Sequence, residues 1–178
     1  MKRKIFIIIL ASILISSGML GSVAAGKRVN NPHGKANVSH LYLFEKDPTT
    51  WEIIDHGAWG KMKYLLSGLE FTFNFNGHGL APELEYSLIY YPDPWPGSGI
   101  ILLGEGITDV YGDIKIKGSV IVEDIPLEHD YNYPDGAKIW LVLSNDVDSI
   151  SRCMIGWNPT LYLFEYDLIR FDSLWGGR

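Results

Sequence analysis

The side chains in this chain that are best suited to contact another molecule are aromatic residues in turn-rich segments. Six of them stand in three such segments: Tyr90, Tyr91 and Trp95 in YYPDPWPGSG, Tyr131 and Tyr133 in DYNYPDG, and Trp157 in GWNP. Loop aromatics offer a large contact area at a small cost in side-chain entropy. They predict a surface on which a sugar ring or another protein stacks. The alternative is that these rings cover the ends of a hydrophobic core.

Acidic and amide side chains in two turns suggest a second role. They are Asp130, Asn132 and Asp135 in EHDYNYPDG, and Asp146 and Asp148 in SNDVDS. Calcium prefers several oxygen ligands on a bent loop, so these turns predict a calcium-stabilised surface module as an alternative function. The spacing is not that of an EF-hand loop, and Asp and Asn also favour turns because they bond to their own backbone. Calcium is the only cofactor that the sequence suggests.

Motifs of known catalytic chemistry are absent from the sequence. It holds no G-x-S-x-G, no H-E-x-x-H, no phosphate-binding glycine loop and no C-x-x-C. The five histidines are scattered, and none stands at metal-ligand spacing from another. We therefore expect no enzymatic activity. A secreted hydrolase remains a further hypothesis, because its two carboxylates need to meet only in space.

The first 25 residues have the three parts of a secretory signal peptide. MKRK is a basic start, residues 5–20 are apolar, and Val23 and Ala25 are placed like the small residues of a cleavage site. We expect a secreted or cell-surface protein with a flexible tether at 26–37. Contact with a membrane is expected only if the N-terminal segment stays uncleaved as an anchor. Asn37 begins the sequon Asn37-Val38-Ser39 and is a candidate for N-glycosylation.

Charge and cysteine content narrow the choice of partners. The formal net charge of the chain is -6, and Lys and Arg do not cluster along the mature sequence. Binding to a phosphate backbone needs a basic face, so no nucleic-acid partner is expected. Cys153 is the only cysteine, which rules out an internal disulfide and leaves stability to the apolar core. The predicted role is structural or binding at the cell exterior, with an extracellular glycan, the matrix or a surface protein as partner.

Short strands separated by turns predict the fold of residues 38–178. In LEFTFNFN, Phe71, Phe73 and Phe75 alternate with polar residues, which is the pattern of a half-buried strand. Other strands are expected at 39–45, 61–67, 84–91, 99–105, 113–122, 137–144 and 160–171, with a short one possible at 51–55 and a helical turn at 127–130. Eight or nine strands indicate one antiparallel β-sandwich, of Greek-key, immunoglobulin-like or jelly-roll type. A closed barrel is the alternative.

The pentapeptide LYLFE occurs twice, at 41–45 and 161–165. The flanks of the two copies differ, and nothing between them repeats, which argues against a duplicated module. Alternation of Leu with Tyr and Phe is typical of a strand buried on both faces. We expect the two copies to form the first and last strands of one sandwich.

Four longer segments carry a family resemblance. They are GAWGKMKYLLSG (57–68), FNGHGLAPELEYSLIYYPDPWPG (75–97), NYPDGAKIWLVLSNDVD (132–148) and WNPTLYLFEYDLIRFD (157–172). These segments resemble a group of secreted archaeal proteins of unknown function. The resemblance implies an exported single-domain protein and assigns no activity or site residue. GHGLAPELEYSL is also similar to the strand–turn–strand of immunoglobulin-like modules, which bears on the fold alone.

Overall fold

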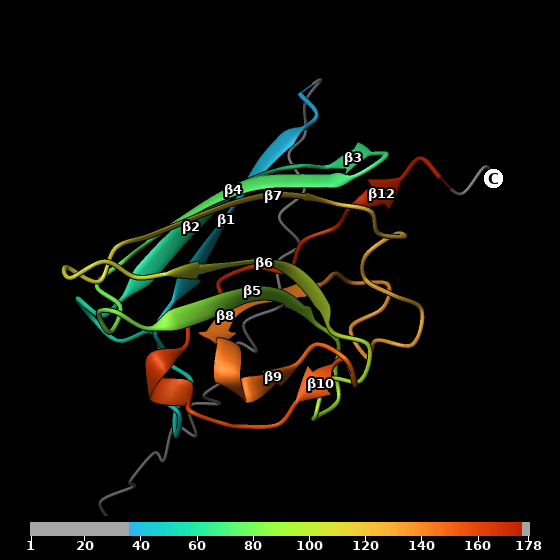
Figure 1. Cartoon of the computed structure of the whole chain (residues 1–178). Coiled ribbons are helices and arrows are strands. Elements are labelled where there is room, and N and C mark those ends of the chain that lie inside the picture. Colours follow the sequence, from blue (N-terminus) through green and yellow to red (C-terminus); the bar gives the residue numbers. More distant parts are fainter. Residues whose placement is uncertain (1–35, 176–178) are drawn as a thin grey trace, which may run out of the picture.

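Two antiparallel β-sheets pack face to face in the computed structural model of the chain, which describes residues 36–175 (Figure 1). The five-stranded sheet has the order β11 (Phe164–Glu165), β1 (Val38–Phe44), β2 (Trp59–Leu65), β4 (Phe71–His78) and β7 (Ile114–Val120). The three-stranded sheet has the order β6 (Ile101–Ile107), β5 (Glu85–Tyr91) and β8 (Lys138–Leu143). The predicted all-β sandwich is confirmed. The predicted signal peptide, 1–25, and the tether up to residue 35 lie outside the described residues.

Side-chain alternation explains why β4 forms where it does. Phe71, Phe73 and Phe75 are buried between the sheets, and the residues between them turn outward. Phe73 stands opposite Gly118 of β7. A Cβ atom on Gly118 would lie 2.7 Å from the Phe73 ring and 3.0 Å from the Leu103 carbonyl oxygen. Only glycine therefore lets the phenyl ring lie against β7 at the edge where β6 and β7 approach each other.

A second apolar cluster lies on the other side of the three-stranded sheet. It contains Ile89 and Tyr91 of β5 and Trp140 and Val142 of β8. A third layer covers it, made of the hairpin β9 (Val147–Asp148) and β10 (Cys153–Met154), the 3-10 turn η2 (Pro159–Leu161) and the loop between them (Figure 1). Burial on both faces is the reason that β5 and β8 are apolar without alternation.

The prediction of one strand at 160–171 is wrong. Pro159 opens η2, and the chain then passes between the two sheets. Leu163 bridges to Leu141 of β8, and the next two residues, as β11, pair with β1. Further bridges join Ile169 to Ala137 and Phe171 to Ile125. The segment ends in β12 (Asp172–Ser173), which runs parallel to β3 (Ser67–Gly68). The apolar residues Leu163, Phe164, Leu168, Ile169 and Phe171 are buried along this path, although no single strand contains them.

The two LYLFE copies lie side by side as antiparallel neighbours, with Phe44 opposite Phe164. The first four residues of the first copy lie in β1, the first strand, as expected. The prediction of burial on both faces is wrong for this copy, because Tyr42 points outward and is 40% exposed. The second copy starts in η2, and only Phe164 and Glu165 are in a strand.

Three smaller expectations also differ from the structure. Residues 127–130 form a hydrogen-bonded turn, with the Asp130 amide donating to the Leu127 carbonyl at 3.0 Å, and not a helix. The segment SNDVDS, expected as a turn, contains the 3-10 turn η1 (Ser144–Asp146) and β9. The short strand expected at 51–55 is reduced to one bridge between Ile53 and Lys46.

Candidate binding site

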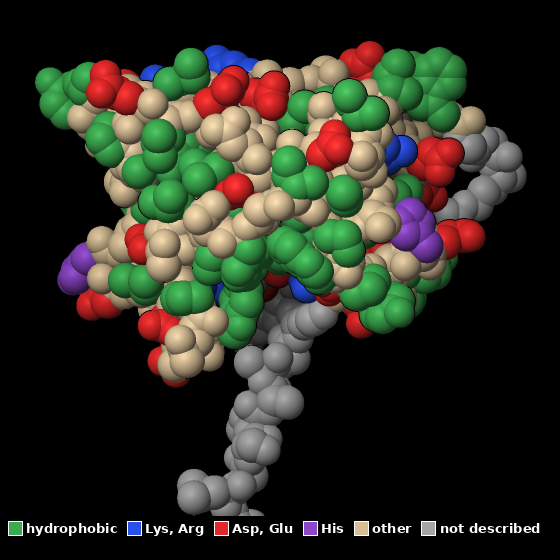
Figure 2. All heavy atoms as spheres, turned by 60° about the horizontal axis from the view of Figure 1, so that its bottom comes forward, with side chains coloured by type: hydrophobic (Ala, Val, Ile, Leu, Met, Phe, Trp, Pro, Cys, Tyr) green, Lys and Arg blue, Asp and Glu red, His purple; other side chains and the backbone are tan. Residues whose placement is uncertain are grey.

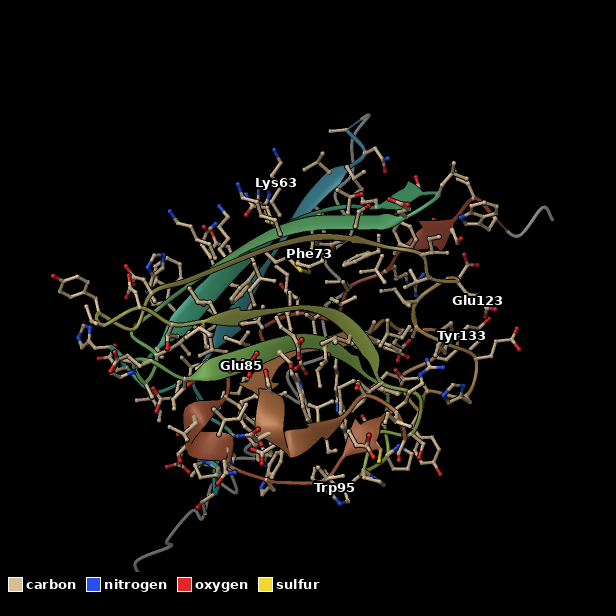
Figure 3. The ribbon with its side chains drawn as sticks, in the orientation of Figure 1. Lys63, Phe73, Glu85, Trp95, Glu123 and Tyr133 are labelled. Carbon is tan, nitrogen blue, oxygen red and sulfur yellow. The ribbon has the colours of Figure 1, made fainter. Side chains whose placement is uncertain are left out.

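An aromatic hollow of about 440 Å³ opens on the third layer, below the three-stranded sheet. Its lining comes from five separate segments of the chain: Lys46, Trp51, Tyr91, Asp93, Trp95, Lys138, Trp140, Trp157, Phe164 and Glu165. Four of the six tryptophans of the chain are among them. Figure 3 labels Trp95 at this end of the molecule, and Figure 2 turns the same end forward and shows hydrophobic side chains gathered over it. We call this feature the aromatic hollow.

The walls of the aromatic hollow are rings that hold one another in place. Trp140 of β8 stacks on Tyr91 of β5, with ring centroids 3.8 Å apart and an interplanar angle of 9°. Trp157 meets Trp95 edge to face at 5.4 Å, and its centroid lies 6.1 Å from that of Trp140. Trp51 meets Phe164 edge to face at 5.1 Å. Offset and edge-to-face pairs of this kind each add about 0.5–1.5 kcal/mol beyond burial.

Three of the tryptophans remain open to solvent despite these contacts. Trp51 is 48% exposed, Trp95 52% and Trp157 41%, whereas Trp140 is only 6% exposed. The backbone of Trp51 has a φ of 60°, in the left-handed region that a bulky residue rarely adopts. The Asp47 carbonyl accepts the Trp51 amide at 2.7 Å and fixes this turn. The exposed rings form the mouth of the hollow, and Trp140 with Tyr91 forms its base.

Four charged side chains join the rings. Lys138 Nζ donates to Asp93 Oδ2 at 2.5 Å and lies 5.9 Å from the centre of the Trp140 ring. Trp140 Nε1 donates to Glu165 Oε2. Lys46 Nζ donates to the Glu165 backbone carbonyl at 2.8 Å. Polar groups therefore stand beside the rings at fixed positions, as in sites that orient a ligand.

Burial shifts the acid–base behaviour of two of these groups. Desolvation raises the pKa of Glu165 above its usual value, and this effect outweighs the opposing influence of Lys46, Lys138 and the Trp140 N–H. Desolvation likewise lowers the pKa of Lys46, with Glu165 opposing the shift and Lys138 adding to it. Burial thus disfavours the charged form of both side chains, and each opposes the effect of burial on the pKa of the other.

Two of the aspartates predicted as calcium ligands form hydrogen bonds that brace the loops of the hollow. Asp130 is 3% exposed, and its carboxylate accepts the Tyr90 hydroxyl at 2.8 Å, the Asp93 amide at 3.2 Å and the Asn132 amide at 2.9 Å. The Asn132 side chain also donates to Asp130 Oδ1 at 3.0 Å and to Asp93 Oδ2 at 2.7 Å. This cluster fixes the start of the loop that carries Trp95.

Asp146 does the same for the loop that carries Trp157. Its Oδ2 accepts the Asn158 side-chain amide at 2.8 Å and the Tyr162 hydroxyl. The Tyr162 hydroxyl in turn accepts the Asn158 backbone amide at 3.0 Å. A Cβ atom on Gly156 would lie 1.9 Å from Asp146 Oδ1, so only glycine fits next to Trp157.

The other predicted calcium ligands do not complete a site with these two. Asp148 Oδ1 accepts the amides of Ile150 and Ser151 at 2.9 and 3.1 Å, which is turn chemistry. Asp135 is exposed, and its backbone carbonyl accepts Arg170 Nε at 3.4 Å. Among residues 36–175, no three Asp, Glu, His or Cys side chains are grouped so that they could hold a metal ion. Calcium binding stays a prediction, with no ligand set in the described residues that supports it.

The six predicted contact aromatics separate into three groups. Tyr91, Trp95 and Trp157 meet in the hollow. Tyr90 is fully buried between the sheets, because its ring points to the opposite face of β5 from Tyr91, and it belongs to the core. Tyr131 and Tyr133 are 78% and 51% exposed but do not line the hollow, and Figure 3 shows Tyr133 at a different side of the molecule from Trp95.

Asn37 lies exposed at the start of the described chain. Its side chain donates to the Ser67 carbonyl at 2.8 Å and accepts the Ser67 amide at 3.0 Å. The side chain therefore links the residue before β1 to the first residue of β3 in the folded protein. N-glycosylation of this residue stays a prediction.

Sequence reasoning missed seven of the ten lining residues: Lys46, Trp51, Asp93, Lys138, Trp140, Phe164 and Glu165. Trp140 stands in the run KIWLVL, where no alternation marks the face that carries it. Phe164 and Glu165 were assigned to a core strand. The signal that was available is the tryptophan content, six residues in 178, four of which meet in one place.

Comparisons of the chain with models of protein families, with curated protein sequences and with solved structures gave no match. The resemblance to secreted archaeal proteins therefore stays a prediction from the sequence. Among the described residues, no helix is both long and apolar enough to span a bilayer.

Proposed function

We propose that this protein is an exported, non-catalytic binding module that holds a neutral sugar in the aromatic hollow. The observation that carries the proposal is the meeting of four tryptophans, Tyr91 and Phe164 around one opening of about 440 Å³. Ligand sites in proteins span roughly 300–1,000 Å³ and combine apolar walls with a few placed polar groups. This hollow has both.

A sugar ring matches the two kinds of surface in the hollow. The C–H face of a pyranose is apolar and packs flat on an indole, while its hydroxyls donate and accept hydrogen bonds at the ring edge. The ring planes of Trp95 and Trp157 are nearly perpendicular, at 79°, so a ligand between them meets the face of one indole and the edge of the other. Asp93, Lys138 and Glu165 stand within the same lining and supply donors and acceptors. The asymmetric mixture of rings and charges supports recognition of a polar ring in one orientation.

Export is supported by the first 25 residues, with their basic start, apolar run and small-residue processing site. The proposed place of action is the cell exterior, either free or surface-associated. N-terminal sequencing of protein recovered from the producing cells tests this part. A mature N-terminus near residue 26 supports export with cleavage, and an intact Met1 in the cytosolic fraction contradicts it.

A hydrolase remains the second candidate, because the hollow contains two carboxyl groups, Asp93 and Glu165, and the pKa of Glu165 is raised. A raised pKa suits a general acid. The second carboxylate is committed, however, since Asp93 Oδ2 accepts both Lys138 and the Asn132 side chain. We therefore place binding first. Release of reducing sugar from any glycan by the wild type, abolished in Glu165→Gln, would reverse this order.

The experiment that tests binding is a screen of the purified protein against a panel of neutral oligosaccharides. We expect at least one glycan to bind and Trp157→Ala to weaken it by roughly 2 kcal/mol, about 30-fold. Trp175→Ala is the matched control, because Trp175 is 62% exposed and lies outside the hollow. If no neutral glycan binds, or if both variants lose binding equally, the proposal fails.

A further inference from the structure

Four lysines stand together on the outer face of the five-stranded sheet, on the opposite side of the molecule from the aromatic hollow. Lys61 and Lys63 belong to β2, and Lys115 and Lys117 belong to β7. In each strand the lysines alternate with buried residues, Met62 or Ile116, so both members of a pair point outward. Figure 3 shows Lys63 directed away from the sandwich and Phe73 directed into it. We call this surface the lysine face.

Strand register fixes the spacing of the four lysines. Lys61 and Lys115 stand on either side of Asn76, and Lys63 and Lys117 stand on either side of Asn74. Two residues along a strand are about 6.8 Å apart, and two strands away is about 9.6 Å. The four side chains therefore start from the corners of a rectangle of roughly 7 by 10 Å. Asparagine amides fill the row between them.

The lysine face is the exception in an acidic domain. All 21 Asp and Glu of the chain lie within residues 36–175, but only eight of its 15 Lys and Arg do. Four of those eight are the lysines of the lysine face. Within the described residues, none of the four forms a salt bridge. His40, next to Lys63, has a pKa lowered by burial and further by Lys61 and Lys63. Positive charge is therefore concentrated on this face and is not paired there in a salt bridge.

Exposed rings border the lysine face on one side. Tyr42, directly opposite Lys61 in β1, is 40% exposed, and the Lys61 ammonium lies 5.2 Å from the centre of its ring. Tyr42 stacks with Phe44 at 6.3 Å, and Tyr166 meets Phe44 edge to face at 5.9 Å. A ligand that contacts the lysines also meets flat apolar surface beside them.

We propose that the lysine face binds a short acidic stretch of a polysaccharide, with carboxylate or sulfate groups on the lysines and sugar rings against Tyr42. Charge complementarity carries the proposal. The Asn74 and Asn76 amides lie between the lysines, where sugar hydroxyls would stand. The site is separate from the aromatic hollow and does not depend on it.

The small size of the lysine face favours an oligosaccharide ligand over a nucleic-acid duplex or a membrane surface. Carboxylates close it at both ends: Asp113 is bonded to His78 at 2.9 Å, and Glu70 accepts the Ser119 hydroxyl. An extended anionic surface would reach past the rectangle and meet the acidic remainder of the domain, which repels it. A narrow chain with a few acidic groups stays within the rectangle.

The test uses the full mature chain with two probes, dextran sulfate and unsulfated dextran of equal length. We expect dextran sulfate to bind, with affinity falling as salt rises, and dextran to bind far more weakly. Lys61→Gln/Lys117→Gln should weaken binding about tenfold or more and reduce the salt slope by about two charges. The Lys→Arg pair at the same positions should restore it, and Arg170→Gln, an exposed cation elsewhere, should leave it unchanged.

Three results would overturn the proposal: equal binding of the two dextrans, unchanged affinity in the Lys→Gln pair, or tighter binding to single-stranded DNA or to vesicles of phosphatidylglycerol than to dextran sulfate. Trp157→Ala separates this site from the aromatic hollow. It should leave dextran sulfate binding intact, so either site can fail without the other.

Discussion

Replacement of Asp130 tests whether the predicted calcium loop is in fact an internal brace. The carboxylate accepts four hydrogen bonds, from the Tyr90 hydroxyl, the Asp93 amide, and the backbone and side-chain amides of Asn132. Asp130→Ala leaves the buried Tyr90 hydroxyl without an acceptor and releases both loop amides. Each buried donor left unpaired costs about 1–3 kcal/mol, so we expect a total loss of roughly 3–5 kcal/mol.

Asp130→Asn provides the graded comparison. Its amide oxygen, placed where Oδ1 now stands, keeps the three bonds from Asp93 and Asn132, and only the bond from Tyr90 is lost. We expect a cost of about 1–2 kcal/mol. Urea unfolding at neutral pH, followed by tryptophan fluorescence, measures both values. A loss below about 1 kcal/mol for the alanine variant, or equal losses for the two variants, would refute the brace.

The same protein decides between brace and calcium ligand. A cation at Asp130 would have to displace the N–H and O–H donors that the carboxylate now accepts. A ligand that binds only the folded state raises the melting temperature by mass action. We expect the melting temperature of residues 26–178 to be the same in calcium and in chelator. A rise of several degrees with calcium would establish the calcium-stabilised module instead.

Three further outcomes follow from burial. Burial raises the pKa of five tyrosines above its usual value near 10: Tyr64, to about 12, and Tyr86, Tyr90, Tyr91 and Tyr162. The stability that these shifts contribute is full below about pH 10 and is lost as pH rises beyond it, so we expect the phenolate absorbance of these five to appear only as the protein unfolds. Ionisation of all ten tyrosines of the chain without unfolding would contradict this. Because the pKa of Glu165 is raised, the folded protein binds more protons at this residue than the unfolded chain does above pH 4.5, and stability falls as pH rises through that region. Glu165→Gln should remove this fall from the urea midpoints measured between about pH 4 and 8. An unchanged slope in the variant would count against the raised pKa. Gly156→Ala would bring a Cβ atom to 1.9 Å from Asp146 Oδ1 and should lower the free energy of unfolding by about 1–3 kcal/mol. Gly68→Ala, whose Cβ would have its nearest contact at 3.3 Å, should lower it by less. Equal losses in the two variants would show that the residues around Asp146 move to accept the extra methyl group.

The strands of the two sheets could be predicted from the sequence because their side chains alternate or because turn-forming residues stand at their ends. Phe71, Phe73 and Phe75 fixed the inner face of β4, and the expected segments near β1, β2, β5, β6, β7 and β8 are strands of the sandwich. The segment at 160–171 failed for a physical reason. Its apolar residues are buried against one sheet and then the other, so hydrophobicity marks burial but not the change of partner from β8 to β1.

The two surfaces were within reach of the sequence to different degrees. The lysine face is marked by KMK at 61–63 and KIK at 115–117, since lysines two apart in a strand share a face. The premise that Lys and Arg do not cluster is therefore wrong in space, although the absence of a nucleic-acid partner stays a prediction. The aromatic hollow depends on five segments meeting behind β8, and no local pattern gives that meeting.

The most direct test of the central claim uses the indole N–H signals of the six tryptophans in a two-dimensional NMR spectrum. A bound neutral oligosaccharide should shift the signals of Trp51, Trp95, Trp140 and Trp157 together along one saturation curve. The signals of Trp59 and Trp175, which lie outside the hollow, should stay in place. Shifts confined to Trp59 or Trp175, or no shift with a glycan that binds by other measures, would contradict the assignment of the aromatic hollow as the binding site.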